Sequence, residues 1–110
     1  MKINIKNNST ENDTKTTWIS EFLKFCQLNY PLKNQINFVL VDNSNTDFFA
    51  DKHIIQLKNK NLNDLFVEIS NRWIDLFSEE KKIKCVNGER ELCVKFFVKK
   101  FPQVQNNLYI

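Results

Sequence analysis

Seven apolar residues between positions 62 and 77 recur at three- and four-residue spacings, and this pattern constrains the fold more than any other feature of the chain. They are Leu62, Leu65, Phe66, Ile69, Trp73, Leu76 and Phe77. Such spacing places the side chains along one side of an α-helix. Asn61 stands directly before them, where its side chain can cap the helix, and Asp64 lies in the first turn, where the helix dipole favours an acid. The sequence therefore predicts a core-facing helix beginning after Asn61.

Shorter patterns predict the remaining elements. They are an edge strand at residues 2–6, a polar loop at 7–16, a helix capped by Thr17 and ended by Pro31, a buried strand at 35–42, a strand at 53–57 and, after Gly88, a helix closed by Pro102. This order, β-α-β-β-α-α, predicts an α+β fold with a short sheet packed against helices. At 110 residues the chain is expected to form a single domain spanning 1–110, with a polar C-terminal tail at about 103–110.

The apolar residues of these elements supply the expected core. The chain is 42% hydrophobic and contains ten Phe and two Trp. The predicted core residues are Phe22, Phe38, Leu40, Ile55, Leu65, Phe66, Ile69, Trp73, Phe96 and Phe97.

Composition excludes several classes of protein. Gly88 is the single glycine, whereas phosphate-binding loops need several. No apolar run reaches the roughly 18 residues of a membrane span, and the first residues lack the apolar region of a signal peptide. We therefore expect a soluble, intracellular protein with no membrane association. Cys26, Cys85 and Cys93 form no C-x-x-C pair and are expected to be reduced packing residues.

The segment Leu-Phe-Val-Glu-Ile-Ser-Asn-Arg-Trp at residues 65–73 resembles the His-Glu-x-x-His helix of zinc metallopeptidases with both histidines replaced. The order of elements over about residues 1–102 is also similar to that of the minimal zincin-type peptidases often encoded by bacteriophages, relatives in fold of the SprT-like and ImmA/IrrE-like metallopeptidases. The resemblance implies a small zincin-like domain whose catalytic helix is the one beginning after Asn61.

By this resemblance, Val67 and Asn71 stand where the two zinc histidines belong, and Glu68 stands where the general base belongs. Glu89 stands at the third, carboxylate ligand, and Cys93 one turn later replaces a small polar or acidic residue. Zinc hydrolysis needs about three protein ligands and an open position for water. Val67 has no lone pair and Asn71 only a neutral oxygen, so we expect no metal, no cofactor and no catalysis, with Glu68 vestigial.

Both glutamates also have ordinary structural interpretations. Glu68 can form an ion pair with Arg72 or with a lysine of the connection that follows the helix, and Glu89 can complement a helix N-terminus. A non-standard metallopeptidase site is a further alternative. His53, Cys26, Cys85 and Cys93 are the available soft ligands, but they lack the local two-ligand spacing of structural zinc sites.

The expected function is therefore that of a catalytically inactive, peptidase-like protein that binds a protein partner or joins a larger assembly. The resemblance implies a phage origin, as a virion component or a host-directed factor, located in a virion or in the cytoplasm of the host cell. The alternative is a nucleic-acid-binding module that uses the basic 81–100 stretch. Its candidate contact residues are Lys81, Lys82, Lys84, Lys95, Lys99 and Lys100. Phe96, Phe97 and Phe101 are expected to face the core, which counts against base stacking.

Overall fold

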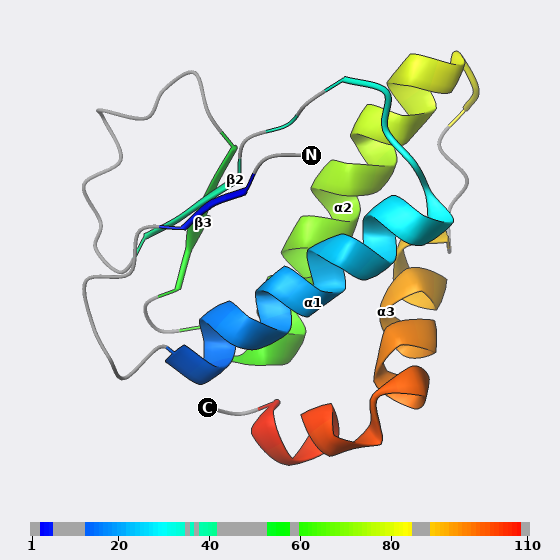
Figure 1. The fold of residues 1–110 in the computed structure, drawn as a ribbon. Coiled ribbons are helices and arrows are strands. Elements are labelled where there is room, and N and C mark those ends of the chain that lie inside the picture. The colour runs from blue at the N-terminus through cyan, green and yellow to red at the C-terminus, as the bar shows by residue number, and fades with distance from the viewer. Residues whose placement is uncertain are drawn as a thin grey trace.

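A three-stranded parallel sheet and the helices packed against it make up a small mixed α and β domain (Figure 1). The computed structural model describes residues 3–5, 13–34, 36, 38–41, 53–57, 60–84 and 89–108. Its elements are β1 (Ile3–Ile5), α1 (Asp13–Asn29), β2 (Phe38–Val41), β3 (His53–Gln56), α2 (Leu62–Lys81), α3 (Glu89–Lys100) and the 3₁₀ helix η3 (Pro102–Asn107). Within these residues the predicted order is confirmed, with η3 added at the end.

The sheet has the order β1-β2-β3, and both neighbouring pairs are parallel. Phe38 of β2 is in register with Ile3 of β1 on one side and with His53 of β3 on the other. Parallel neighbours need a crossover connection, and α1 lies in the one between β1 and β2. The predicted edge position of the first strand and central position of the second are confirmed. Figure 1 shows the helices gathered on one side of this sheet.

Helix α1 begins earlier than predicted. The prediction of a loop is wrong for residues 13–16, which form the first turn of α1, whereas residues 7–12 lie outside the described residues. Lys15 in this turn is buried, and its Nζ donates a hydrogen bond to the carbonyl oxygen of Leu57, 3.3 Å away at the end of β3. A lysine can bury its aliphatic stem while its ammonium donates to an oxygen. Lys15 therefore lets this polar turn pack against the end of β3 without an apolar side chain.

Helix α2 follows the prediction closely. The Oδ1 of Asn61 accepts a hydrogen bond from the backbone N–H of Asp64 at 2.9 Å, which confirms the predicted cap. The helix ends at Lys81, and Lys82 takes a left-handed conformation with φ of 54°. Trp73 is fully buried, stacks on Phe38 with ring centroids 6.0 Å apart, and donates its indole N–H to the carbonyl of Tyr30 at 2.8 Å. An apolar body and a satisfied N–H explain its place in the core.

The C-terminal residues are more structured than predicted. Pro102 closes α3 as expected, and residues 103–107 of the predicted polar C-terminal tail belong to η3. Val104 in η3 is buried. The backbone N–H of Leu62 donates to the carbonyl of Leu108 at 2.8 Å, so this segment satisfies one of the first amides of α2. Residues 109 and 110 lie outside the described residues.

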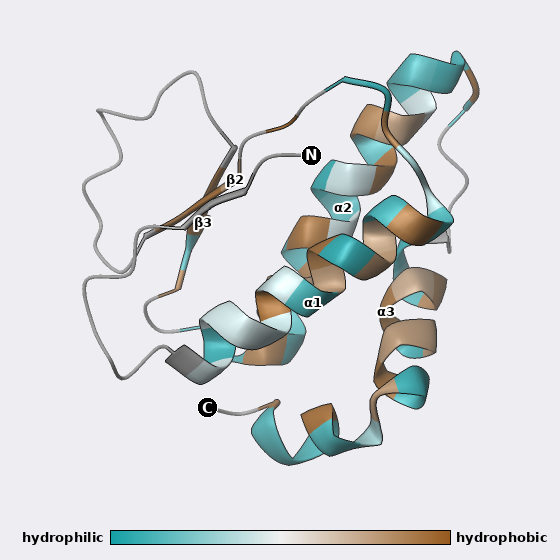
Figure 2. Cartoon of the chain, in the orientation of Figure 1, coloured by the Kyte–Doolittle hydropathy of each residue, from teal (hydrophilic) through white to brown (hydrophobic). Residues whose placement is uncertain are grey.

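Nine of the ten predicted core residues are buried. The exception is Phe96, which is 56% exposed, so its prediction as core is wrong. Helix α3 contacts the rest of the domain through the side that carries Cys93 and Phe97. Phe96 is not on this side. Figure 2 shows brown and teal alternating along α2, whereas α3 is brown through its middle turns and teal in its last turn. Apolar residues thus occur around much of α3, and only part of them is covered.

Candidate functional site

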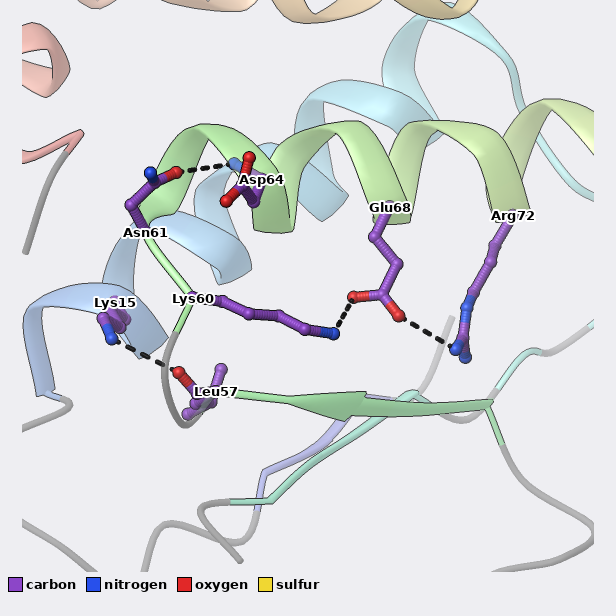
Figure 3. A network of polar contacts seen from close by, with 7 residues as sticks. All are labelled: Lys15, Leu57, Lys60, Asn61, Asp64, Glu68 and Arg72. Carbon is purple, nitrogen blue, oxygen red and sulfur yellow. Dashed lines mark hydrogen bonds and ion pairs between the residues drawn. The ribbon is translucent and has the colours of Figure 1, made fainter. Parts of the chain in front are cut away.

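Glu68 lies at the centre of a polar network between α2 and the end of β3 (Figure 3). Its Oε2 is 3.2 Å from the Nζ of Lys60, and its Oε1 is 3.1 Å from the Nη2 of Arg72. The Glu68 side chain is 26% exposed, so these are partly buried ion pairs. The predicted pairing with Arg72 is confirmed. The lysine partner is Lys60, which precedes the helix, and not a lysine of the connection that follows it.

This arrangement gives Glu68 a structural task. Lys60 stands directly before the cap residue Asn61, and Arg72 stands one turn after Glu68. Glu68 therefore connects the residue before the cap of α2 to the middle of the helix, and its side chain extends toward β3 (Figure 3). Each of its carboxylate oxygens holds one cation. Partly exposed pairs of this kind contribute about 0.2–1 kcal/mol each.

Asn71 points to a different neighbour from Glu68. Its Oδ1 accepts a hydrogen bond from the Nη1 of Arg90 at 3.4 Å, and the Nη2 of Arg90 pairs with Asp75. The hydroxyl of Ser70 donates to the carbonyl oxygen of Arg90 at 2.8 Å. Position 71 is thus part of a tie between α2 and the first turn of α3. Val67, at the other position that the resemblance compares with a zinc histidine, is 40% exposed.

Positions 71 and 89, which the resemblance compares with zinc ligands, lie on neighbouring turns of α2 and α3. Glu89 is the first residue of α3 and adjoins Arg90, whose side chain contacts Asn71. The side chain of Glu89 is outside the described part of the structure. The resemblance also predicts that Glu68 and Glu89 lie within about 10 Å of each other, and this stays a prediction.

Two of the three cysteines meet in the core. The Sγ atoms of Cys26 in α1 and Cys93 in α3 are 3.9 Å apart, and both side chains are buried thiols. The hydrogen bond with the Cys93 thiol, reinforced by burial and by the Cys93 charge, raises the pKa of Cys26 far above its usual range. A protonated thiol is a poor nucleophile and a poor metal ligand. The prediction of reduced packing residues is confirmed for this pair, whereas Cys85 lies outside the described residues.

The structure also bears on a non-standard metal site. Over residues 3–5, 13–34, 36, 38–41, 53–57, 60–84 and 89–108, no group of three or more His, Cys, Asp or Glu residues is placed to hold a metal ion. His53 begins β3, but its side chain is not among those described. Of the four soft ligands considered, only the Cys26 and Cys93 pair is brought together by described side chains.

The six lysines of the nucleic-acid alternative are all exposed, but they fall into two groups. Lys81, Lys82 and Lys84 lie at or just beyond the C-terminal end of α2, and Lys95, Lys99 and Lys100 lie in the later turns of α3. Figure 1 shows these two helix ends on opposite sides of the molecule. The structure therefore does not gather the six lysines into one surface.

Sequence reasoning missed that two apolar residues are exposed beside the lysines of α3. Leu92 is 46% exposed and Phe96 is 56% exposed, on the same helix as Lys95, Lys99 and Lys100. The expectation that Phe96 faces the core, which counted against a binding surface here, is wrong. The sequence carries no signal that separates the two i, i+4 apolar pairs of α3, Leu92 with Phe96 and Cys93 with Phe97, because both fit an apolar stripe of ordinary width.

Comparison with known proteins gives no relative: no family model, no curated protein and no solved structure matches this chain. Among the described residues, no helix is long and apolar enough to cross a membrane.

Proposed function

We propose that this chain is a catalytically inactive, zincin-like domain that acts by binding another protein. The observation that carries the proposal is the hydrogen bond from Arg90 to Asn71. The position that a zinc histidine would occupy holds an amide that joins α2 to α3, and the other histidine position holds the aliphatic Val67. A phage origin, as a virion component or host-directed factor, is part of the same proposal and rests on the resemblance alone.

The chemistry of the remaining residues supports this proposal. A zinc peptidase needs about three protein ligands and a metal-bound water that a nearby base can deprotonate. Glu68 is directed to Lys60 and Arg72 on the β3 side of α2, whereas Asn71 is directed to α3. A general base acts on a water only when both are held within hydrogen-bond reach. The two side chains therefore serve separate structural contacts in place of one shared site.

The proposed lack of catalysis is tested on the purified chain by elemental analysis for zinc and by a casein-cleavage assay with added zinc. We expect no stoichiometric metal and no cleavage above that of a Glu68→Gln variant. Stoichiometric zinc, or cleavage that Glu68→Gln abolishes, would contradict the proposal and direct attention to His53 and the cysteines.

The zincin-like relationship has its own test, which restores the missing ligands. A Val67→His/Asn71→His variant should bind one zinc ion if position 89 supplies the third ligand, because three ligands from α2 and α3 then complete the site. The matched control adds Glu89→Gln to the same two histidines. We expect the control to bind zinc at least about tenfold more weakly, as the loss of a charged ligand requires. Equal affinity would show that position 89 does not face the histidine positions and would remove the support for a zincin-like arrangement.

A second candidate function, nucleic-acid binding, is favoured by one observation. Phe96 is exposed on the helix that carries Lys95, Lys99 and Lys100, and an aromatic ring among lysines can stack on a base. Its test is binding of a fluorescent single-stranded oligonucleotide between about 50 and about 200 mM salt. Affinity that falls steeply with salt and is lost in Phe96→Ser would favour this candidate. Absence of binding at the lower salt concentration would exclude it.

A further inference from the structure

The outward side of α3 combines exposed apolar and basic residues, and we call it the α3 face. It consists of Leu92, Lys95, Phe96, Lys99 and Lys100. Leu92 and Phe96 are one helical turn apart, so their side chains are neighbours on the helix surface. The adjoining side of the same helix buries Cys93, Val94 and Phe97 against the core. The α3 face is therefore turned away from the domain.

We infer that the α3 face docks an acidic amphipathic segment of another protein, one that presents apolar residues at helical spacing flanked by Asp or Glu. The inference rests on the proposed function, because it names the partner chemistry of a protein-binding domain. Single exposed apolar residues are common on protein surfaces and need no explanation. An exposed leucine and phenylalanine one turn apart, bordered by three lysines, form a specific pattern that a complementary segment can match.

Charge selects an acidic partner. Lys95, Lys99 and Lys100 are all exposed, and within the described residues none of them has a carboxylate partner. Lys100 instead lies over the ring of Phe25 at 6.0 Å. Glu91 is the one acidic side chain described on α3. Positive residues around an apolar centre attract acidic partners and repel basic ones, which sets specificity and speeds association.

The same pattern disfavours the other occupants. A second copy of this chain would place lysines opposite lysines, because a two-fold interface brings the same surface of both copies together. Nucleic acid would gain base stacking from Phe96 but nothing comparable from Leu92, which has no ring. An anionic membrane surface would be bound weakly by a face with only two apolar side chains, since interfacial helices depend on a large buried apolar area.

The test is a selection of random dodecapeptides displayed on phage against the intact chain. We expect the selected peptides to be enriched in Asp and Glu and to carry apolar residues three or four positions apart. Binding of the most enriched peptide, measured by fluorescence anisotropy, should weaken at least about tenfold in Phe96→Ser. The matched control is Leu28→Ser, at a residue of α1 that is 73% exposed, which should change affinity by less than about twofold. Circular dichroism confirms that each variant is folded.

Charge reversal tests the electrostatic half of the inference. Selection against Lys95→Glu/Lys99→Glu should no longer enrich acidic peptides, because the sign of the flanking charge has changed. The inference is overturned by failure to enrich acidic peptides on the unaltered chain, or by equal binding to Phe96→Ser and the unaltered chain. If the selected peptides bind but not through the α3 face, this inference fails, whereas the proposed protein-binding function stands with its site elsewhere on the domain. Phe96-dependent binding to an oligonucleotide or to anionic vesicles, without peptide selection, would replace this partner with another class.

Discussion

Helices α2 and α3 both carry apolar residues at helical spacing, but they differ in the burial of their aromatic residues. Trp73 and Phe66 of α2 are fully buried, whereas α3 buries Phe97 and exposes Phe96. Helix α2 packs against both α1 and α3, and its Trp73 stacks on Phe38 of the sheet. Helix α3 lies at the outside of the domain and is covered on one side only. The difference shows that spacing decides which residues share a side of a helix, and neighbours decide which side is buried.

The comparison assigns different tasks to the two helices. Helix α2 organises the core and holds its polar side chains in local ion pairs, as Glu68 does with Lys60 and Arg72. Helix α3 completes the core with its inner side and presents the α3 face to solvent. Binding a partner requires an uncovered surface such as the α3 face, whereas a stable core requires a helix that is buried by its neighbours, as α2 is.

The largest expected effect falls on α2. Trp73→Ala should lower the free energy of unfolding by about 3–5 kcal/mol, because it leaves a cavity beside Phe38 and removes the donor to the Tyr30 carbonyl. Urea unfolding followed by circular dichroism measures this change. Trp73→Phe is the control that keeps an aromatic ring, and it should lose less than half as much. A loss below about 1 kcal/mol for Trp73→Ala would show that α2 does not organise the core.

Two adjacent residues of α3 test its two sides directly. The Phe97 ring lies 5.0 Å from that of Phe22 and 5.2 Å from that of Phe66, so Phe97→Ala should cost about 3–5 kcal/mol. Phe96→Ala should cost less than about 1 kcal/mol, because its ring is already more than half exposed. Urea unfolding of the pair gives the difference. Similar decreases in the free energy of unfolding for both variants would mean that α3 buries Phe96 as well as Phe97 against the core.

The same two helices show how far sequence reasoning can go. The cap at Asn61 and the burial of Trp73 follow from local signals, a polar residue before an apolar stripe and a spacing of three or four. The exposure of Phe96 does not follow, because Leu92 with Phe96 and Cys93 with Phe97 are equivalent pairs in the sequence. The choice between them depends on contacts with α1, which is distant in the chain.

Long-range contacts also explain what was missed at the candidate site. The pairing of Glu68 with Arg72 is an i, i+4 interaction and was predicted from spacing. The tie of Asn71 to Arg90 spans 19 positions, and the contact of Lys15 with Leu57 spans 42. No local pattern encodes such contacts. The early start of α1 was missed for the same reason, because the partner of its first turn lies at the end of β3.

The thiol pair at the contact of α1 and α3 predicts a pH dependence. The pKa of Cys26 is raised in the folded chain, so above about pH 8.5 the unfolded chain releases a proton that the folded chain keeps. The contribution of this thiol to stability is therefore complete below that pH and is lost as the pH rises further. We expect the free energy of unfolding, measured with a reductant present, to fall by about 1 kcal/mol more per pH unit in the unaltered chain than in Cys26→Ala. Equal slopes would show that Cys26 is not buried as a protonated thiol.

The start of α2 depends on one capping side chain. Asn61→Ala removes the acceptor for the N–H of Asp64 and should cost about 1 kcal/mol by urea unfolding. Asn63→Ala is the matched control, since Asn63 is exposed in the first turn and has no capping role. We expect it to be neutral or slightly stabilising, because alanine is the better helix former. If the two variants behave alike, the start of α2 is held by the bond from Leu62 to Leu108 alone.

The smallest expected effect concerns the polar side of α2. Glu68→Gln weakens the pairs with Lys60 and Arg72 and should cost about 0.5–1 kcal/mol at low salt, with the loss shrinking as salt screens the charges. Glu79→Gln is the control on the same helix, because Glu79 is exposed and has no ion pair among the described residues. A larger loss for Glu68 than for Glu79 would show that α2 uses its charged residues to hold its own entrance in place. Equal losses would show that the ion pairs of Glu68 do not stabilise α2, and the contrast between the two helices would then rest on their apolar residues alone.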